Sequence, residues 1–287
     1  MQSFLHHDLH KVELEAYAKK DFHCNRGYGI CNLNQTFVNA RRSTKFEKRN
    51  KMNLKQKFLP FLFLGITSLA TAQEIKSEFN KEVKVQKKMS YILDMPQNTK
   101  SKVPLIVFLH GSGERGNDLE IVKNHSPFTY KNLIKEPVAI LAPQCPANTW
   151  WDTEAVYFLI KEISEKYKID KDRIYLTGLS MVGWGTLKLA GEHPEMFAAV
   201  SAVCAPTDRT MWANIHNYKD LNIKLFHGGM DDIVLPENAF NFYQKLHPVN
   251  PKAELTIFPN DNHNSWDSTY SDPKLYEWML SLKKSKN

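Results

Sequence analysis

The sequence has few cysteines, and this excludes a disulfide-rich scaffold. There are 4 Cys in 287 residues, and Cys24 and Cys31 precede the candidate domain. Cys145 and Cys204 each end an apolar run, where one disulfide or two buried thiols would fit equally well. No group of His, Cys, Asp and Glu has the spacing of a metal site, so we expect no metal and no other cofactor.

An excess of positive charge is also lacking over most of the chain. The formal net charge is +7, but residues 1–72 hold 12 Lys and Arg against 5 Asp and Glu. Residues 73–287 therefore hold 26 of each sign. A basic groove for phosphates is not implied, and we expect no nucleic-acid partner.

The third absence is an apolar run long enough to span a bilayer. The apolar stretch 58–69 is about a dozen residues long, where a spanning helix needs roughly 20. It follows the positive segment 52–57 and precedes Ala70-Thr71-Ala72, which is a small-x-small cleavage site. These three parts predict a signal peptide at residues 52–72, and therefore a secreted or periplasmic protein with no stable membrane anchor.

The predicted signal peptide starts at Met52 rather than at residue 1. Residues 1–51 are polar and lack steady periodicity. We interpret them as a gene-model extension, and the alternative is a long disordered leader. Residues 73–287 then form the mature chain, which is long enough for one α/β domain.

Apolar runs alternate with helical patterns and predict a mainly parallel sheet with helices on both faces. Strands are expected at 103–109, 138–142, 173–179, 197–203, 223–226 and 255–258, with an early antiparallel strand pair at 83–93. Helices are expected from Asp152 or Thr153, after Ser180 up to Glu192, at 236–246 and at 273–282. The interval 205–222 is too short for a large lid domain, so we expect an open site.

The chemistry centres on the segment around Ser180. A β-branched and aromatic run turns sharply at Gly178 and Ser180 and continues as a helix, which is the context of a nucleophile elbow. The Met181 N–H then lies at a helix N-terminus, where an oxyanion is stabilised. The usual Gly-x-Ser-x-Gly pattern is broken because Val182 takes the last glycine position and Gly183 follows. A small residue is expected there, since the helix passes close to a neighbouring strand.

Two further polar residues follow strands, and together with Ser180 they complete a triad. Asp231 follows the strand at 223–226 and His263 follows the strand at 255–258. The carboxyl ends of parallel strands share one edge of the sheet, where ligands bind. Imidazole can take the serine proton near neutral pH, and a carboxylate fixes the imidazole tautomer. Asp232 adjoins Asp231 and is the alternative acid.

The motifs together resemble the esterase/peptidase branch of the α/β-hydrolases, which includes secreted carboxylesterases and prolyl-oligopeptidase-like proteins. They are LHGSGERGND at 109–118, APQCP at 142–146, LTGLSM at 176–181, HGxxD at 227–231 and NHNSWD at 262–267. The resemblance implies Ser180 as nucleophile, His263 as general base, Asp231 as orienting acid, and the N–H groups of Met181 and Ser112 as oxyanion donors. It implies cleavage of a small-molecule ester, with a small serine peptidase as the runner-up.

Other residues border the expected cleft. Gln144, Trp151 and Trp266 are candidate substrate contacts for an acylated carbohydrate or an aromatic ester, and core packing is the alternative for them. Trp150 follows the same strand as Gln144 and Trp151 and borders the same cleft. Glu114 and Arg115 are expected to pair and to shape the glycine-rich loop at 110–116, which we call the oxyanion loop. The remaining histidines near the motifs are interpreted as structural, namely His110, His125 and His227. If Val182 disturbs the elbow, the domain would instead bind a ligand without turnover.

Overall fold

The structure is a computed structural model that describes residues 74–284. The predicted extension (1–51) and signal peptide (52–72) therefore lie outside the described residues. The folded unit begins at Glu78, and residues 74–77 of the unit before it contain no helix or strand. Between residues 74 and 284, every helix falls short of the length and apolarity that a membrane span requires.

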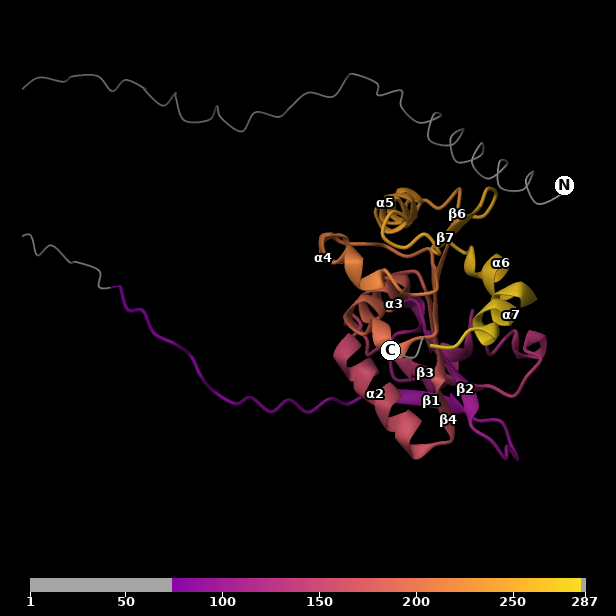
Figure 1. Cartoon of the computed structure of the whole chain (residues 1–287), viewed down its shortest axis with the longest axis horizontal. Coiled ribbons are helices and arrows are strands. Elements are labelled where there is room, and N and C mark those ends of the chain that lie inside the picture. Colours follow the sequence, from indigo (N-terminus) through magenta and orange to yellow (C-terminus); the bar gives the residue numbers. More distant parts are fainter. Residues whose placement is uncertain (1–73, 285–287) are drawn as a thin grey trace, which may run out of the picture. The chain divides into compact units, whose positions relative to one another are not determined.

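A seven-stranded sheet forms the centre of the folded unit (Figure 1). The strand order is β1-β3-β2-β4-β5-β6-β7, and only β1 runs antiparallel to its neighbour. The strands are β1 (Ser90–Asp94), β2 (Val103–Leu109), β3 (Ala139–Gln144), β4 (Ile169–Leu179), β5 (Ala199–Val203), β6 (Ile223–Gly228) and β7 (Glu254–Phe258). The mainly parallel sheet predicted from the apolar runs is confirmed.

Helices cover both faces of the sheet, also as predicted (Figure 1). The α-helices are α2 (Thr153–Lys166), α3 (Met181–Glu192), α4 (Arg209–Ala213), α5 (Glu237–Leu246), α6 (Trp266–Tyr270) and α7 (Pro273–Ser281). Short 3₁₀ helices are η1 (Ser112–Glu114), η2 (Leu119–Lys123), η3 (Lys131–Leu133), η4 (Pro194–Met196) and η5 (Ile215–Tyr218). The sequence analysis did not predict the five-residue helices α4 and α6.

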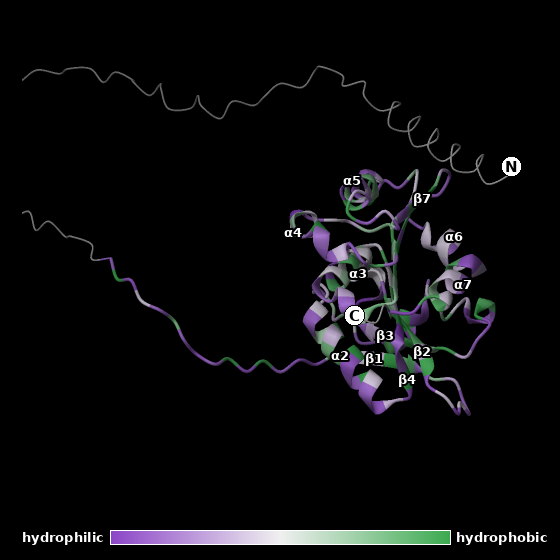
Figure 2. Ribbon diagram, viewed as in Figure 1, coloured by the Kyte–Doolittle hydropathy of each residue, from purple (hydrophilic) through white to green (hydrophobic). Residues whose placement is uncertain are grey.

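The two faces follow from the alternation of side chains along each strand. In β2, Leu105 and Val107 pack in one core cluster with residues of α2, α3 and α5. Ile106 and Phe108 point the other way and pack in a second cluster with residues of α6 and α7. Figure 2 shows hydrophobic residues along the central strands and hydrophilic residues on the outer helices. Because β2 is buried on both faces, its sequence is a continuous apolar run.

One strand prediction is wrong in extent. The segment 83–93 was expected to form a strand pair, but only Ser90–Asp94 is a strand, and it pairs with β3. Residues 81–88 are exposed, so their loose alternation has no core to cover. The predicted start of the next helix is confirmed, since Asp152 caps α2 by accepting a hydrogen bond from the Ala155 N–H at 3.0 Å.

Candidate active site

Ser180 occupies a strained position between β4 and α3. Its backbone has φ 56° and ψ −129°, a region that non-glycine residues rarely adopt. Two backbone hydrogen bonds hold the turn, one from the Ser180 N–H to the Val203 carbonyl at 2.9 Å and one from the Gly183 N–H to the Ser180 carbonyl at 2.8 Å. The strand–turn–helix context predicted for this serine is present.

The helix that follows Ser180 makes its closest approach at Gly183. A Cβ on Gly183 would lie 2.4 Å from the Ala205 Cβ and 2.6 Å from the Ala205 Cα, so only glycine fits without movement of the backbone. The tight contact that we expected at position 182 therefore lies one residue later. The chain keeps a glycine where α3 passes the end of β5, and this explains how it departs from the usual motif without losing the turn.

Three side chains that are far apart in the sequence form one hydrogen-bonded chain. The Ser180 Oγ lies 2.7 Å from the His263 Nε2, and the His263 Nδ1 lies 2.8 Å from the Asp231 Oδ2. Asp231 is buried, whereas the alternative acid Asp232 is exposed. With the proton on Nδ1, the imidazole is free to accept the serine proton at Nε2. The arrangement is suited to activating Ser180 as a nucleophile.

The loop after β6 fixes the carboxylate of Asp231. Its Oδ1 accepts hydrogen bonds from the N–H groups of Ile233 and Val234, each at 2.9 Å. The fully buried His227 adds a third support, because its Nε2 lies 2.7 Å from the Val234 carbonyl and 3.2 Å from the Asp231 Oδ2. Burial lowers the pKa of His227, so the ring is neutral and its Nε2–H serves both acceptors. The predicted structural role of His227 is thus to hold the Asp231 carboxylate. In the sequence, only the HGxxD spacing at 227–231 points to this contact.

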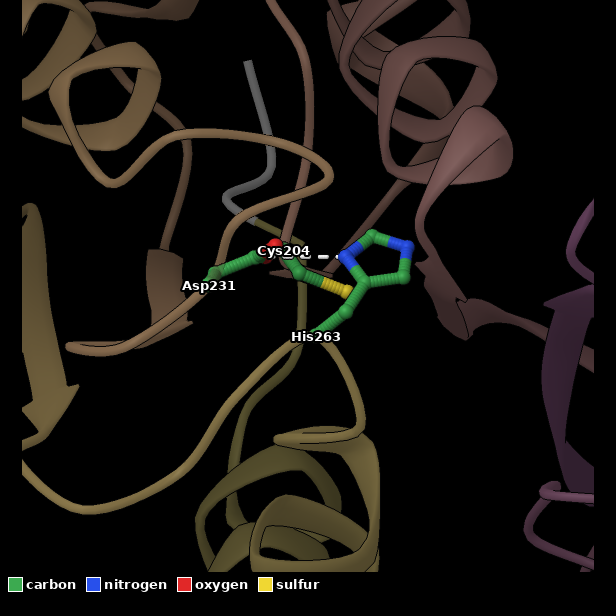
Figure 3. A group of neighbouring side chains, drawn as sticks. All are labelled: Cys204, Asp231 and His263. Carbon is green, nitrogen blue, oxygen red and sulfur yellow. Dashed lines mark hydrogen bonds and ion pairs between the residues drawn. The ribbon is translucent and has the colours of Figure 1, made fainter.

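Cys204 lies against the Asp231–His263 pair, as Figure 3 shows. The three candidate ligand atoms fall within 4.8 Å of one another. Burial raises the pKa of the Cys204 thiol to about 12, and metals bind the thiolate rather than the thiol. Because Asp231 and His263 also bond to each other, the group fits proton transfer better than metal binding. Cys145 and Cys204 are both free and buried, so the two buried thiols are observed and not the disulfide.

The loop after β2 lies beside Ser180. A Cβ on Gly111 would be 4.0 Å from the Ser180 Cβ, so the Gly111–Ser112 segment borders the nucleophile. Arg115 ties this loop down by donating to the Ser112 and Thr149 carbonyls, each at 3.1 Å. Arg115 does not pair with Glu114, which corrects our expectation. The N–H groups of Ser112 and Met181 stay predicted oxyanion donors.

His110 also fixes the loop after β2 through two hydrogen bonds. Its Nε2 accepts a hydrogen bond from the Cys145 N–H at 3.0 Å, and its Nδ1–H donates to the Gly111 carbonyl at 2.7 Å. Desolvation by burial lowers the pKa of His110 to about 4, so the ring is neutral near pH 7. The structural role predicted for His110 is therefore a specific one, since it joins β3 to the oxyanion loop.

Two of the predicted substrate contacts are wrong, because their side chains are buried. Gln144 is 2 % exposed, and its Nε2 donates to the Glu114 and Asp118 carbonyls, at 3.1 and 2.7 Å. Trp151 is 4 % exposed and packs edge-on against His110 and against Gly185 of α3. Both support the oxyanion loop and α3 instead of facing a ligand.

The third predicted contact, Trp266, lies beside the triad. Its ring meets that of His263 edge-on, with centroids 5.4 Å apart. It also contacts the exposed His125, with ring centroids 5.6 Å apart. Its Nε1–H is buried and has no hydrogen-bond partner among residues 74–284. Trp266 therefore borders the imidazole, and its role in binding substrate stays a prediction.

Comparisons with known proteins identify similar sequences and folds. A model of the phospholipase/carboxylesterase family matches residues 152–274, a range that includes all three triad residues. The crystal structure of a thermostable esterase is 32 % identical with a TM-score of 0.62; the match covers 68 % of this chain and 59 % of that one. No curated protein matches the chain.

Two more distant structures share the fold. Est1E from Butyrivibrio proteoclasticus has a TM-score of 0.52 at 16 % identity, over 67 % of this chain and 93 % of its own. A putative dipeptidyl aminopeptidase IV from Bacteroides ovatus has a TM-score of 0.54 at 17 % identity, over 68 % of this chain and 34 % of its own. The sheet and its covering helices form the α/β-hydrolase fold, and the chain is similar to the phospholipase/carboxylesterase family over residues 152–274.

Proposed function

We propose that this protein is an exported serine hydrolase that cleaves carboxylic esters through an acyl-enzyme intermediate. The observation that carries the proposal is the hydrogen-bonded chain from the Ser180 Oγ through His263 to Asp231. Export is proposed from the signal-peptide pattern at residues 52–72.

The residues support the following reaction. His263 Nε2 takes the proton of Ser180 as its Oγ attacks the ester carbonyl, and Asp231 stabilises the imidazolium that forms. The N–H groups of Met181 and Ser112 would hold the oxyanion, each donor contributing ~3 kcal/mol. His263 then protonates the leaving alcohol, and water attacks the acyl-Ser180 ester by the reverse route, which releases the acid.

Esters are favoured over peptides for two reasons. The thermostable esterase is the relative that shares 32 % identity, although this chain spans only 59 % of its length. The segment between β5 and β6 holds only α4 and η5, so the described residues there build no cap domain that would select peptides. The likeness to the putative dipeptidyl aminopeptidase IV concerns the fold alone.

The direct test is hydrolysis of p-nitrophenyl acetate by the wild-type chain and by Ser180→Ala. We expect kcat/KM to fall by several orders of magnitude in the variant, because the nucleophile is lost. Ser271→Ala, at an exposed serine outside the triad, serves as the matched control and should keep wild-type activity. Equal rates for wild type and Ser180→Ala would contradict the proposal and favour a binding module. Faster cleavage of an alanine p-nitroanilide than of the ester would favour the peptidase.

A further inference from the structure

The rim of the site carries an aromatic surface that the triad does not use. Trp150 is 60 % exposed and comes six residues after the end of β3. It adjoins Thr149, whose carbonyl accepts a hydrogen bond from Arg115 of the loop after β2. Its ring meets that of Trp184 edge-on, with centroids 5.4 Å apart. Trp184 lies one helical turn after Ser180 on α3, so the exposed Trp150 ring contacts a side chain that starts one turn from Ser180.

A pocket continues from Trp184 along α3. It has a volume of about 220 Å³ and runs between α3 and the segment of α4 and η5. This is smaller than the roughly 300–1,000 Å³ of sites that enclose a drug-sized ligand, so it suits a single ring. Its wall is mixed: Trp184, Met211 and Tyr218 supply apolar surface, and the charged and amide groups come from Lys188, Glu192, Asp208, Asn214 and Asn217.

The polar groups in this wall are fixed and keep spare capacity for hydrogen bonds. The Asp208 Oδ2 accepts from the Trp184 Nε1–H at 2.7 Å, and its Oδ1 caps α4. Hydrogen bonds lower the pKa of Asp208 in spite of partial desolvation, so the carboxylate is charged at neutral pH. Asn214 and Asn217 each donate one amide N–H to a backbone carbonyl, and among residues 74–284 nothing donates to either amide oxygen.

We propose that Trp150, Trp184 and the Asp208 pocket form a subsite for the sugar part of an acylated carbohydrate. An exposed indole beside a ring-sized pocket with carboxylate and amide groups matches a hydroxylated ring, whose C–H face stacks while its hydroxyl groups are hydrogen-bonded. An acyl chain or an aryl group could use the apolar part of the wall, but it would leave the Asp208 carboxylate and the two amide oxygens without a ligand donor. The inference rests on the proposed esterase function, because it assigns the alcohol part of the substrate to this surface.

The test compares acetylated xylobiose with p-nitrophenyl acetate as substrates of wild type, Trp150→Ala and Asp208→Asn. Loss of the exposed ring should raise KM for the acetylated sugar about tenfold, which corresponds to ~1.4 kcal/mol of stacking. Turnover of p-nitrophenyl acetate should stay unchanged, since that substrate has no sugar. Asp208→Asn can still cap α4 through its amide oxygen but loses the charge and the acceptor for the Trp184 Nε1–H, and it should raise KM for the sugar ester. Phe158→Ala removes an exposed aromatic ring on α2 and is the control for surface truncation.

The outcomes separate this inference from the proposed function. Hydrolysis of p-nitrophenyl acetate with no response of the sugar ester to Trp150→Ala overturns the subsite and leaves the esterase standing. If Trp150→Ala raised KM for α-naphthyl acetate as much as for the sugar ester, the surface would bind aryl groups, and the sugar subsite would also be overturned. If Ser180→Ala matches the wild type on every ester, the esterase fails. Calorimetry then compares the binding of unacylated xylobiose to Ser180→Ala and to Ser180→Ala combined with Trp150→Ala. Weaker binding in the double variant supports the subsite, and equal binding overturns it.

Discussion

Ser180 and Asp231, the proposed nucleophile and acid, are held in place by different means. The turn that carries Ser180 is fixed by close packing, since α3 passes the end of β5 with only the space that Gly183 allows. The loop that carries Asp231 is fixed by polar contacts, from two backbone N–H groups and from the neutral His227. We therefore expect the turn at Ser180 to be sensitive to added side-chain volume. The loop at Asp231 should be sensitive to the loss of hydrogen-bond donors, acceptors or charge.

The largest expected effect concerns the acid. Asp231→Asn should reduce kcat/KM by about 10⁴-fold, because an amide of the same shape no longer selects the Nδ1–H tautomer of His263. The neighbouring Asp232→Asn is the matched control and should stay close to wild type, since Asp232 is exposed. Ester turnover of the two variants is the measurement. If the two variants lost activity equally, the assignment of the acid would be wrong.

The next effect concerns volume at the serine turn. Gly183→Ala should destabilise the fold by ~1–3 kcal/mol, because its Cβ would overlap the Ala205 backbone. A shift of Ser180 by even an ångström would also cut the rate by ~100-fold. Val182→Gly should give no gain in rate, because the tight contact lies at Gly183. Urea unfolding and ester kinetics on both variants check this, and a rate increase in Val182→Gly would contradict it.

The smallest effect is a pH dependence at His110. The pKa of this buried ring is lowered from 6.5 to about 4, so the unfolded chain takes up the proton first as the pH falls. Stability from this group is present above pH 6.5 and is lost between pH 6.5 and 4, by up to ~1.4 kcal/mol per pH unit. His110→Gln keeps an acceptor for the Cys145 N–H but cannot titrate, so its stability should fall less steeply.

Urea unfolding of wild type and His110→Gln at pH 7, 6 and 5 measures that slope. His216→Gln, at an exposed histidine on η5, is the matched control and should fall as steeply as the wild type. If the free energy of unfolding of His110→Gln fell with pH as steeply as that of the wild type, the acid sensitivity of the fold would come from other groups.

Much of the fold could be predicted from the sequence because the signals are local. Strands buried on both faces, such as Val103–Leu109, are unbroken apolar runs, and Asp152 before α2 is a recognisable cap. The order of Ser180, Asp231 and His263 at strand ends brought the candidate triad together, since parallel strands deliver their ends to one edge of the sheet.

The errors have one physical origin, which is that side-chain direction and distance depend on packing. The sequence places Gln144, Trp150 and Trp151 near the cleft, but it does not show that Trp150 faces solvent while the other two are buried. It shows a glycine missing at position 182, but not that the close contact falls at Gly183. The alternation at 83–89 resembles a strand, yet residues 81–88 are exposed and cover no core.

The central claim is that His263 activates Ser180 as a nucleophile. Labelling with a fluorophosphonate followed by peptide mass spectrometry tests it most directly, because the reagent modifies an activated serine. The account predicts a single adduct on the peptide that contains Ser180, and a labelling rate that collapses in His263→Ala. An unmodified Ser180, or labelling that proceeds equally fast without the imidazole, would contradict the account.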